Sequence, residues 1–194
     1  MPLNSLLKFV LTGLAGCVLG LAATYVVLQK GTGFGQIRVG PWIIAPKNGS
    51  SDIDPYARAQ MARTGEIVLA HAEGLSFLAH TDSAGHRLEP GCDYVVSGSV
   101  PDSRAWSLTL VTRSGALVDN PAKRYGFTSA EILRAADGTF EITIARSAHP
   151  GNWLPVVTSQ PFDLMLRLYD TLLDFGTSKL DDKALPRITR GACV

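Results

Sequence analysis

The sequence lacks the short motifs by which many enzymes are identified. G-x-S-x-G, H-E-x-x-H, C-x-x-C and the glycine-rich phosphate loop are all absent. Serine hydrolases with a nucleophile elbow, zinc proteases, thioredoxin-like proteins and P-loop nucleotide-binding proteins therefore lose their usual support. We predict no cofactor and no metal site.

Charge is also scarce and balanced. Lys8 and Lys30 are the charged residues among the first 30 positions, which leaves 16 basic against 17 acidic residues in the rest of the chain. No basic stripe is present, so nucleic acid is excluded as a predicted partner.

One long apolar run stands out near the N-terminus. Residues 9–28 carry no charge, and as a helix they are long enough to cross the hydrocarbon of a lipid bilayer. We predict an uncleaved anchor over residues 1–30. A lipoprotein signal ending at Cys17 and a secretory signal cut near Ala22 or Ala23 are the alternatives, and the apolar run beyond them disfavours both.

The position of this run also predicts a location. A short tail before the anchor and a large domain after it favour export of the C-terminal part, although the flanking basic residues discriminate poorly. We predict a single-pass protein of a bacterial inner membrane with its C-terminal domain in the periplasm. In that compartment Cys92 and Cys193 can form a disulfide, with two free thiols as the alternative.

A glycine-rich linker is predicted over residues 31–41. Its G-x-G-x-G pattern is not a nucleotide fingerprint, because a membrane helix precedes it and Pro41 follows. A short helix is predicted from Pro55 to about Thr64, since Asp54 is a good N-cap and Gly65 is placed to end it.

After this helix the apolar period changes to two, which predicts strands. Three clear runs begin at Trp106, Phe140 and Phe162, and turn-forming pairs such as Asp137-Gly138 separate the strands. We expect Asp137-Gly138 to join residues 132–136 to 139–145 as a hairpin. The pattern predicts a mainly β fold, an antiparallel jelly-roll-like β-sandwich over residues 42–194.

Three segments occur in the order in which a known family carries similar ones. They are AWSLTLVTRSGALVDNPAKRYGF (105–127), DGTFEITIA (137–145) and NWLPVVTSQPFDLMLRLYD (152–170). The chain resembles the bacterial family known as domain of unknown function 1214. The resemblance implies a jelly-roll-like sandwich, found behind a second β domain or, alone, behind an N-terminal membrane helix. It implies no agreed activity and no catalytic residue.

Two histidine and carboxylate pairs are the catalytic candidates. His71 with Glu73, and His80 with Asp82, are each two residues apart, so on a strand both side chains lie on one face. Arg104 and Arg167 are candidate anion-binding residues. A solvated strand face is the more common explanation of such pairs.

Other polar residues in the predicted strands have structural explanations. Arg167 is interpreted as a strand residue that extends its charge to solvent or pairs with Asp163 on the same face.

Aromatic residues are the candidates for ligand binding. Trp106, Tyr125 and Trp153 offer the flat faces on which sugars and peptides stack, and a sandwich core uses the same residues. Trp153 lies in HPGNWLP (149–155), which we interpret as a structural plug at one end of the sandwich rather than the rim of a ligand site.

Three functions are compatible with these observations. The first is a membrane-anchored envelope module that docks a partner protein, and we prefer it. The second is binding of a glycan or another small polar ligand. The third is a hydrolase or isomerase that uses the histidine and carboxylate pairs.

Overall fold

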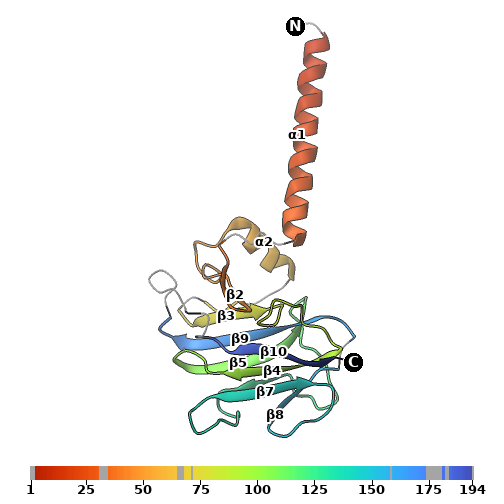
Figure 1. The fold of residues 1–194 in the computed structure, drawn as a ribbon. Helices are drawn as coiled ribbons and strands as arrows, with labels where there is room; N and C mark the ends of the chain where they lie inside the picture. The colour runs from red at the N-terminus through yellow and green to blue at the C-terminus, as the bar shows by residue number, and fades with distance from the viewer. Residues whose placement is uncertain are drawn as a thin grey trace. The chain divides into compact units, whose positions relative to one another are not determined.

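The computed structural model describes residues 3–30, 35–64, 68–70, 72–157, 159–173, 181 and 184–193. In this part of the chain the helices are α1 (Leu3–Lys30) and α2 (Pro55–Thr64). The strands are β1 (Ile37–Val39), β2 (Trp42–Ile44), β3 (Gly74–Ala79), β4 (Cys92–Gly98), β5 (Ser103–Thr112), β6 (Gly126–Thr128), β7 (Phe140–Ala145), β8 (Asn152–Pro155), β9 (Phe162–Thr171) and β10 (Arg187–Cys193) (Figure 1). The chain is therefore mainly β, as predicted.

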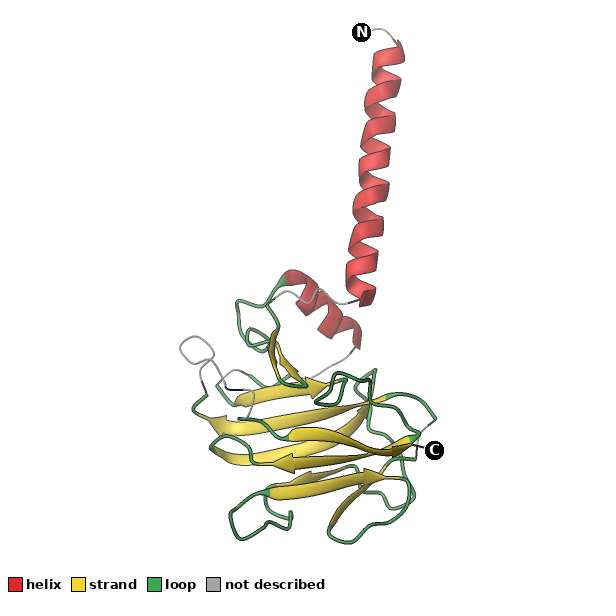
Figure 2. Cartoon of the chain, in the orientation of Figure 1, coloured by secondary structure: helices red, strands yellow, loops and turns green. Residues whose placement is uncertain are grey.

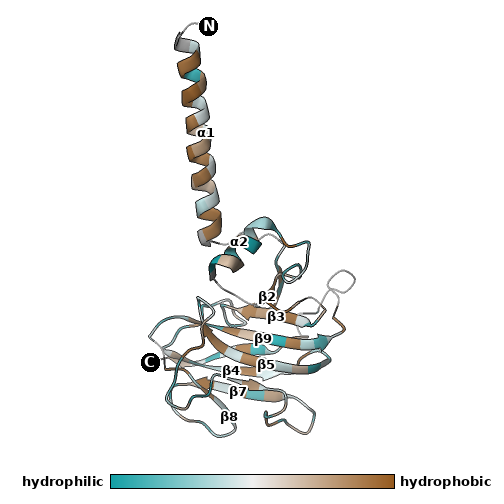
Figure 3. Cartoon of the chain, turned by 180° about the vertical axis from the view of Figure 1, so that it is seen from behind, coloured by the Kyte–Doolittle hydropathy of each residue, from teal (hydrophilic) through white to brown (hydrophobic). Residues whose placement is uncertain are grey.

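The chain divides into two compact units, and the first contains both helices. It comprises Met1–Phe34 and Ile53–Glu66. α1 is apolar along most of its length (Figure 3), and its residues Ser5–Leu28 have a mean hydropathy of 2.0. This is the one helix among the described residues that is long and apolar enough to cross a membrane.

The sequence predicts the bounds of α2 well. The Asp54 carboxylate accepts hydrogen bonds from the backbone N–H groups of Tyr56 (2.9 Å) and Ala57 (3.2 Å), so it caps the first turn. Pro55 takes the first helical position, where its missing N–H costs no hydrogen bond. Arg63 lies in the last turn, where a positive charge suits the helix dipole.

The second unit, Gly35–Asp52 with Ile67–Val194, contains two sheets (Figure 2). The strand order is β1-β2-β3-β9-β5-β6 in the six-stranded sheet and β10-β4-β7-β8 in the four-stranded sheet. Strand neighbours are antiparallel except β7 and β8, which run parallel. This pair corrects the prediction of a wholly antiparallel fold. The two-sheet architecture is established, and the jelly-roll connectivity stays a prediction.

The inner faces of the two sheets share one hydrophobic core. In the predicted alternating runs Leu108, Ile142 and Leu164 are all buried. Aromatic contacts join the two layers. Tyr94 of β4 meets the ring of Phe162 of β9 edge-on at 5.8 Å, and Trp106 of β5 stacks on Phe140 of β7 at 4.8 Å.

Three segments differ from the sequence expectations. Residues 37–39 lie within the predicted linker but form β1, which pairs with β2. The hairpin predicted around Asp137-Gly138 is reduced to one bridge between Arg134 and Phe140. HPGNWLP contributes β8, an edge strand in which Leu154 is fully buried, so this segment belongs to the smaller sheet.

Candidate functional site

A groove of about 460 Å³ lies on the outer face of the four-stranded sheet. Ile142 and Ile144 of β7 point into the core, so the alternating residues Glu141 and Thr143 point outward. Ser97 of β4 is the cross-strand partner of Glu141, which places both on the groove floor. The groove residues include Ser97, Leu133, Arg134, Thr139, Phe140, Glu141, Thr143 and Asn152.

Asn152 fixes the rim of this groove. Its Nδ2 donates to the carbonyls of Leu133 and Glu141, each at 2.8 Å, and its Oδ1 accepts from the N–H of Leu133 at 2.8 Å. The side chain is buried, and the three bonds are partly buried. The loop that carries Leu133 and Arg134 is therefore held against β7 before any ligand arrives.

Arg134 supplies a positive charge at the rim. Its Nη1 donates to the carbonyl of Gly138 at 3.0 Å. Its guanidinium carbon lies 5.7 Å from the ring centroid of Trp106 and 6.0 Å from that of Phe140. These contacts favour a fixed cation over the aromatic pair. Glu141 adds an exposed carboxylate to the floor.

A hydrogen-bonded turn next to Arg134 supports the same rim. The Asp137 carboxylate accepts from the Thr139 hydroxyl at 2.6 Å and from the Thr139 N–H at 3.0 Å. The pKa of Asp137 lies below its usual value, mainly because the Thr139 hydroxyl donates to the carboxylate and also because the Thr139 N–H does.

The aromatic candidates lie in three different settings. Trp106 is 3% exposed and belongs to the core, so it offers no open face to a ligand. The Trp153 indole N–H donates to the Ala145 carbonyl at 3.0 Å, which fixes this half-buried ring to β7. The Tyr125 hydroxyl donates to Asp119 at 3.2 Å, outside the groove.

His80 and Asp82, which are two residues apart in the sequence, contact different partners. Nδ1 of His80 lies 2.9 Å from a carboxylate oxygen of Asp163, and Nδ1 of His86 lies 3.5 Å from one of Asp82. Asp82 is buried, and its other oxygen accepts from two backbone N–H groups of the turn after β3. Asp82 therefore has a structural explanation.

The remaining candidates are dispersed as well. Glu73 is exposed just before β3, and Arg104 forms an exposed ion pair with Asp170 at 3.5 Å. His71 lies outside the described residues. In the part of the chain that the structure describes, no three His, Cys, Asp or Glu side chains lie close enough to hold a metal ion.

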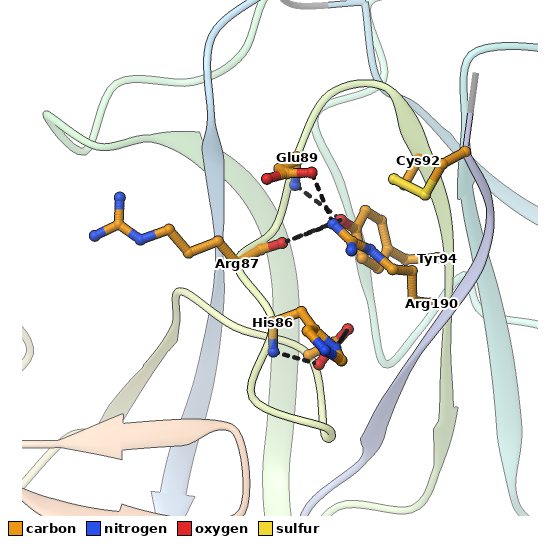
Figure 4. The surroundings of a disulfide bond; sticks show 8 residues. His86, Arg87, Glu89, Cys92, Tyr94 and Arg190 are labelled. Carbon is orange, nitrogen blue, oxygen red and sulfur yellow. Dashed lines mark hydrogen bonds and ion pairs between the residues drawn. A yellow bond between two sulfur atoms is a disulfide. The ribbon is translucent and has the colours of Figure 1, made fainter.

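A disulfide joins Cys92 and Cys193 between β4 and β10 (Figure 4). Close to it, one terminal nitrogen of Arg190 donates to Glu89 at 2.9 Å and to the Arg87 carbonyl at 3.2 Å. The pKa of Arg190 is raised, mainly by its hydrogen bond to the Tyr94 hydroxyl and also by the Glu89 charge. These contacts hold β10 in place on the smaller sheet.

The groove could not be found from the sequence. Arg134 and Glu141 sit in a turn and on a strand where charged residues are ordinary, and Asn152 reads as a turn former. Its three bonds join segments that are distant in sequence, so no local pattern predicts them.

Comparison with known proteins gives a family and a fold. The family model described as "Protein of unknown function (DUF1214)" matches residues 73–172. The VPA0106 protein of Vibrio parahaemolyticus has a similar structure, with a TM-score of 0.58 and 19% identity, over 91% of this chain and 44% of that one. The chain thus spans less than half the length of that protein.

A second structure is more distant. It is that of a putative uncharacterized protein from Burkholderia cenocepacia, with a TM-score of 0.40 and 21% identity over 61% of this chain and 29% of that one. No curated protein matches the chain.

Proposed function

The chain belongs to the DUF1214 family, and we propose that it is a membrane-anchored envelope module that docks a partner protein in the groove of its four-stranded sheet. One observation carries the proposal. Leu133 is 66% exposed beside Arg134 on a rim that the three hydrogen bonds of Asn152 already fix. An exposed apolar side chain next to a charge suits a protein contact, and a fixed rim lowers the entropy lost on binding.

The chemistry of the groove defines the partner segment. We expect an apolar side chain of the partner to pack on Leu133, and a carboxylate of the partner to pair with Arg134. Glu141 is expected to disfavour a second acidic group on the groove floor.

The proposed location rests on two features. Residues Ser5–Leu28 are suited to a single membrane crossing. The disulfide between Cys92 and Cys193 suits an oxidising compartment such as the periplasm. Together they support an inner-membrane protein with its sandwich outside the cytoplasm.

A small polar ligand is the second candidate, because the size and lining of the same groove favour it. Its volume of about 460 Å³ is within the usual range for small-molecule sites. Ser97, Thr139 and Thr143 offer hydroxyl groups to a sugar or a similar ligand.

Site-specific photocrosslinking in the native envelope tests the docking proposal. A photoreactive residue replaces Leu133 in the full chain, and in a matched control it replaces Leu117, which is 53% exposed and lies outside the groove. We expect a protein adduct of defined mass from position 133 only. Arg134→Glu should remove that adduct, because it reverses the charge offered to the partner.

The other outcomes contradict docking at this site. Equal adducts from both positions would indicate non-specific contact. No adduct from position 133, together with a sugar that binds in the groove, would favour the small-ligand alternative.

A further inference from the structure

A polar row crosses the outer face of the six-stranded sheet, on the side of the sandwich away from the groove. Leu166 and Leu168 of β9 point into the core, so Arg167 between them points outward. Its cross-strand partners are Ser76 of β3 and Ser107 of β5. A guanidinium therefore lies between two hydroxyl side chains on the three adjacent strands of this sheet.

Arg167 has no acceptor among the described residues. Its Nε is shielded from solvent and makes no hydrogen bond, and the same is true of the Ser76 hydroxyl. Asp163, which the sequence offered as a partner on the same face, contacts His80 at 2.9 Å, and no ion pair joins it to Arg167. A shielded guanidinium N–H without an acceptor is unfavourable, so this arrangement is incomplete.

The neighbouring groups add hydrogen-bonding capacity. The hydroxyls of Ser107 and Tyr169 lie 3.5 Å apart, at the edge of the row. Guanidinium and hydroxyl groups together form a set of donors, and no carboxylate among the described residues forms an ion pair with Arg167. Carboxylate and phosphate groups fit such a set, because two of their oxygens accept in parallel from two N–H groups along one edge of a guanidinium.

We propose that Arg167, with Ser76 and Ser107, binds the oxoanionic group of a small molecule, either a carboxylate or a phosphate. The anion accepts from Nε and the adjacent terminal nitrogen of Arg167, which supplies the missing acceptor. Because Nε is shielded in the free chain, a rotamer change of Arg167 or of a neighbouring side chain accompanies binding. This site is independent of the groove and of the docking proposal.

Arginine side-chain NMR on the full chain in a nonionic detergent tests the site directly. The protein carries ¹⁵N-labelled arginine, and the Nε–H signal that Arg167→Lys removes is that of Arg167. Inorganic phosphate and acetate are titrated separately, with sodium chloride at matched ionic strength as the reference. The two anions distinguish a phosphate ligand from a carboxylate ligand.

We expect one of the two anions to shift the Arg167 signal saturably while chloride does not. Thermal unfolding gives a second measurement, because a ligand that binds the folded chain raises its Tm. Arg167→Lys keeps the charge but loses the planar fork, and should weaken binding about tenfold or more. Arg146→Lys is the matched control, because Arg146 is exposed after β7 of the other sheet and lies outside the groove, and it should leave binding unchanged.

Two results would overturn the proposal. One is an Arg167 signal that neither anion shifts more than chloride does, which would mean that its acceptor comes from a protein or is not required. The other is binding that persists in Arg167→Lys with unchanged affinity. If that variant does not fold, Ser107→Ala replaces it in the thermal-unfolding measurement, and an undiminished rise of Tm with the anion there would have the same meaning.

Discussion

At the scale of single residues, three of the buried polar side chains of the sandwich hold loops in place. Asn120 donates to the carbonyls of Val118 and Arg124 and accepts from the Arg124 N–H, in the way that Asn152 ties its own loop. Asp82 accepts from two N–H groups of the turn that it begins. Such residues shape the surface because each one fixes a loop by several bonds.

Asn152→Ala is expected to destabilise the sandwich and loosen the groove. The change leaves both backbone groups of Leu133 and the carbonyl of Glu141 without their partner. We expect a loss of about 1–3 kcal/mol in the free energy of unfolding, measured by urea denaturation of the full chain. Leu133→Ala, an exposed neighbour, should cost less than about 0.5 kcal/mol. Equal losses in both variants would show that Asn152 has no special role.

Asp119 predicts a pH dependence with a defined sign. The pKa of Asp119 lies below its usual value. The main cause is the hydrogen bond from the Lys123 ammonium, and the hydrogen bond from the Tyr125 hydroxyl adds to it. A lowered pKa stabilises the fold above the usual carboxyl value, and this contribution is lost as the pH falls through the lowered value. In Lys123→Met the pKa should move up toward normal, as followed by carboxyl NMR titration.

The outcome for Lys123 is checked by a second exposed lysine. Lys47→Met should leave the Asp119 titration unchanged, since the lysine that contacts Asp119 is Lys123. A titration curve of Asp119 that is identical in Lys123→Met and the unaltered chain would refute the assigned cause.

The expected geometry of one residue pair depended on secondary structure that the chain does not have. His80 and Asp82 share a face only if the strand continues, but β3 ends at Ala79 and the chain turns. His80 then lies beside Asp163 of β9, which needs knowledge of which strands are neighbours. The cap of α2 by Asp54 was predictable because it depends on adjacent residues alone.

At the scale of elements, the strands with regular alternation were predictable. β5, β7 and β9 coincide with the three clear apolar runs. β8 carries Pro155 and is preceded by Pro150, so its sequence resembles a loop, and its parallel partner β7 fixes it as a strand. β10 contains two arginines and a glycine and is defined by its pairing with β4.

Loss of the disulfide is expected to loosen β10 selectively. Cys92 and Cys193 are 101 residues apart, and removal of such a native bridge costs about 2–5 kcal/mol. In Cys92→Ser with Cys193→Ser we expect a lower unfolding free energy and faster amide hydrogen exchange in β10. Cys17→Ser is the control, because Cys17 is an exposed free thiol of α1. Exchange that quickens equally in β9 would contradict a local effect.

At the scale of the whole molecule, the sequence predicts the class of fold better than its topology. Apolar period and turn-forming residues predict a mainly β chain behind one apolar helix, and both are found. The order of strands in each sheet depends on contacts between distant segments, which local patterns do not encode. The similarity to the VPA0106 structure at 19% identity shows that this fold tolerates wide sequence change.

Membrane attachment is the prediction that belongs to this scale. We expect the full chain to stay in the membrane fraction after alkaline carbonate extraction, since residues Ser5–Leu28 can bury a continuous apolar surface in lipid. Mass spectrometry should give the complete translated mass. A product that begins at a lipid-modified Cys17, or after Ala22 or Ala23, would show instead that the segment is a cleaved signal.

The central place of β9 also bears on how the polypeptide reaches its native state. β9 is made late, yet it must insert between β3 and β5, which emerge from the ribosome much earlier. Pairings between such distant segments form slowly, because a long loop has to close first. Until then β3 and β5 expose unpaired backbone N–H and C=O groups, with which other nascent chains can pair. We expect the yield in cells to depend on a chaperone that shields these edges until synthesis has passed β9.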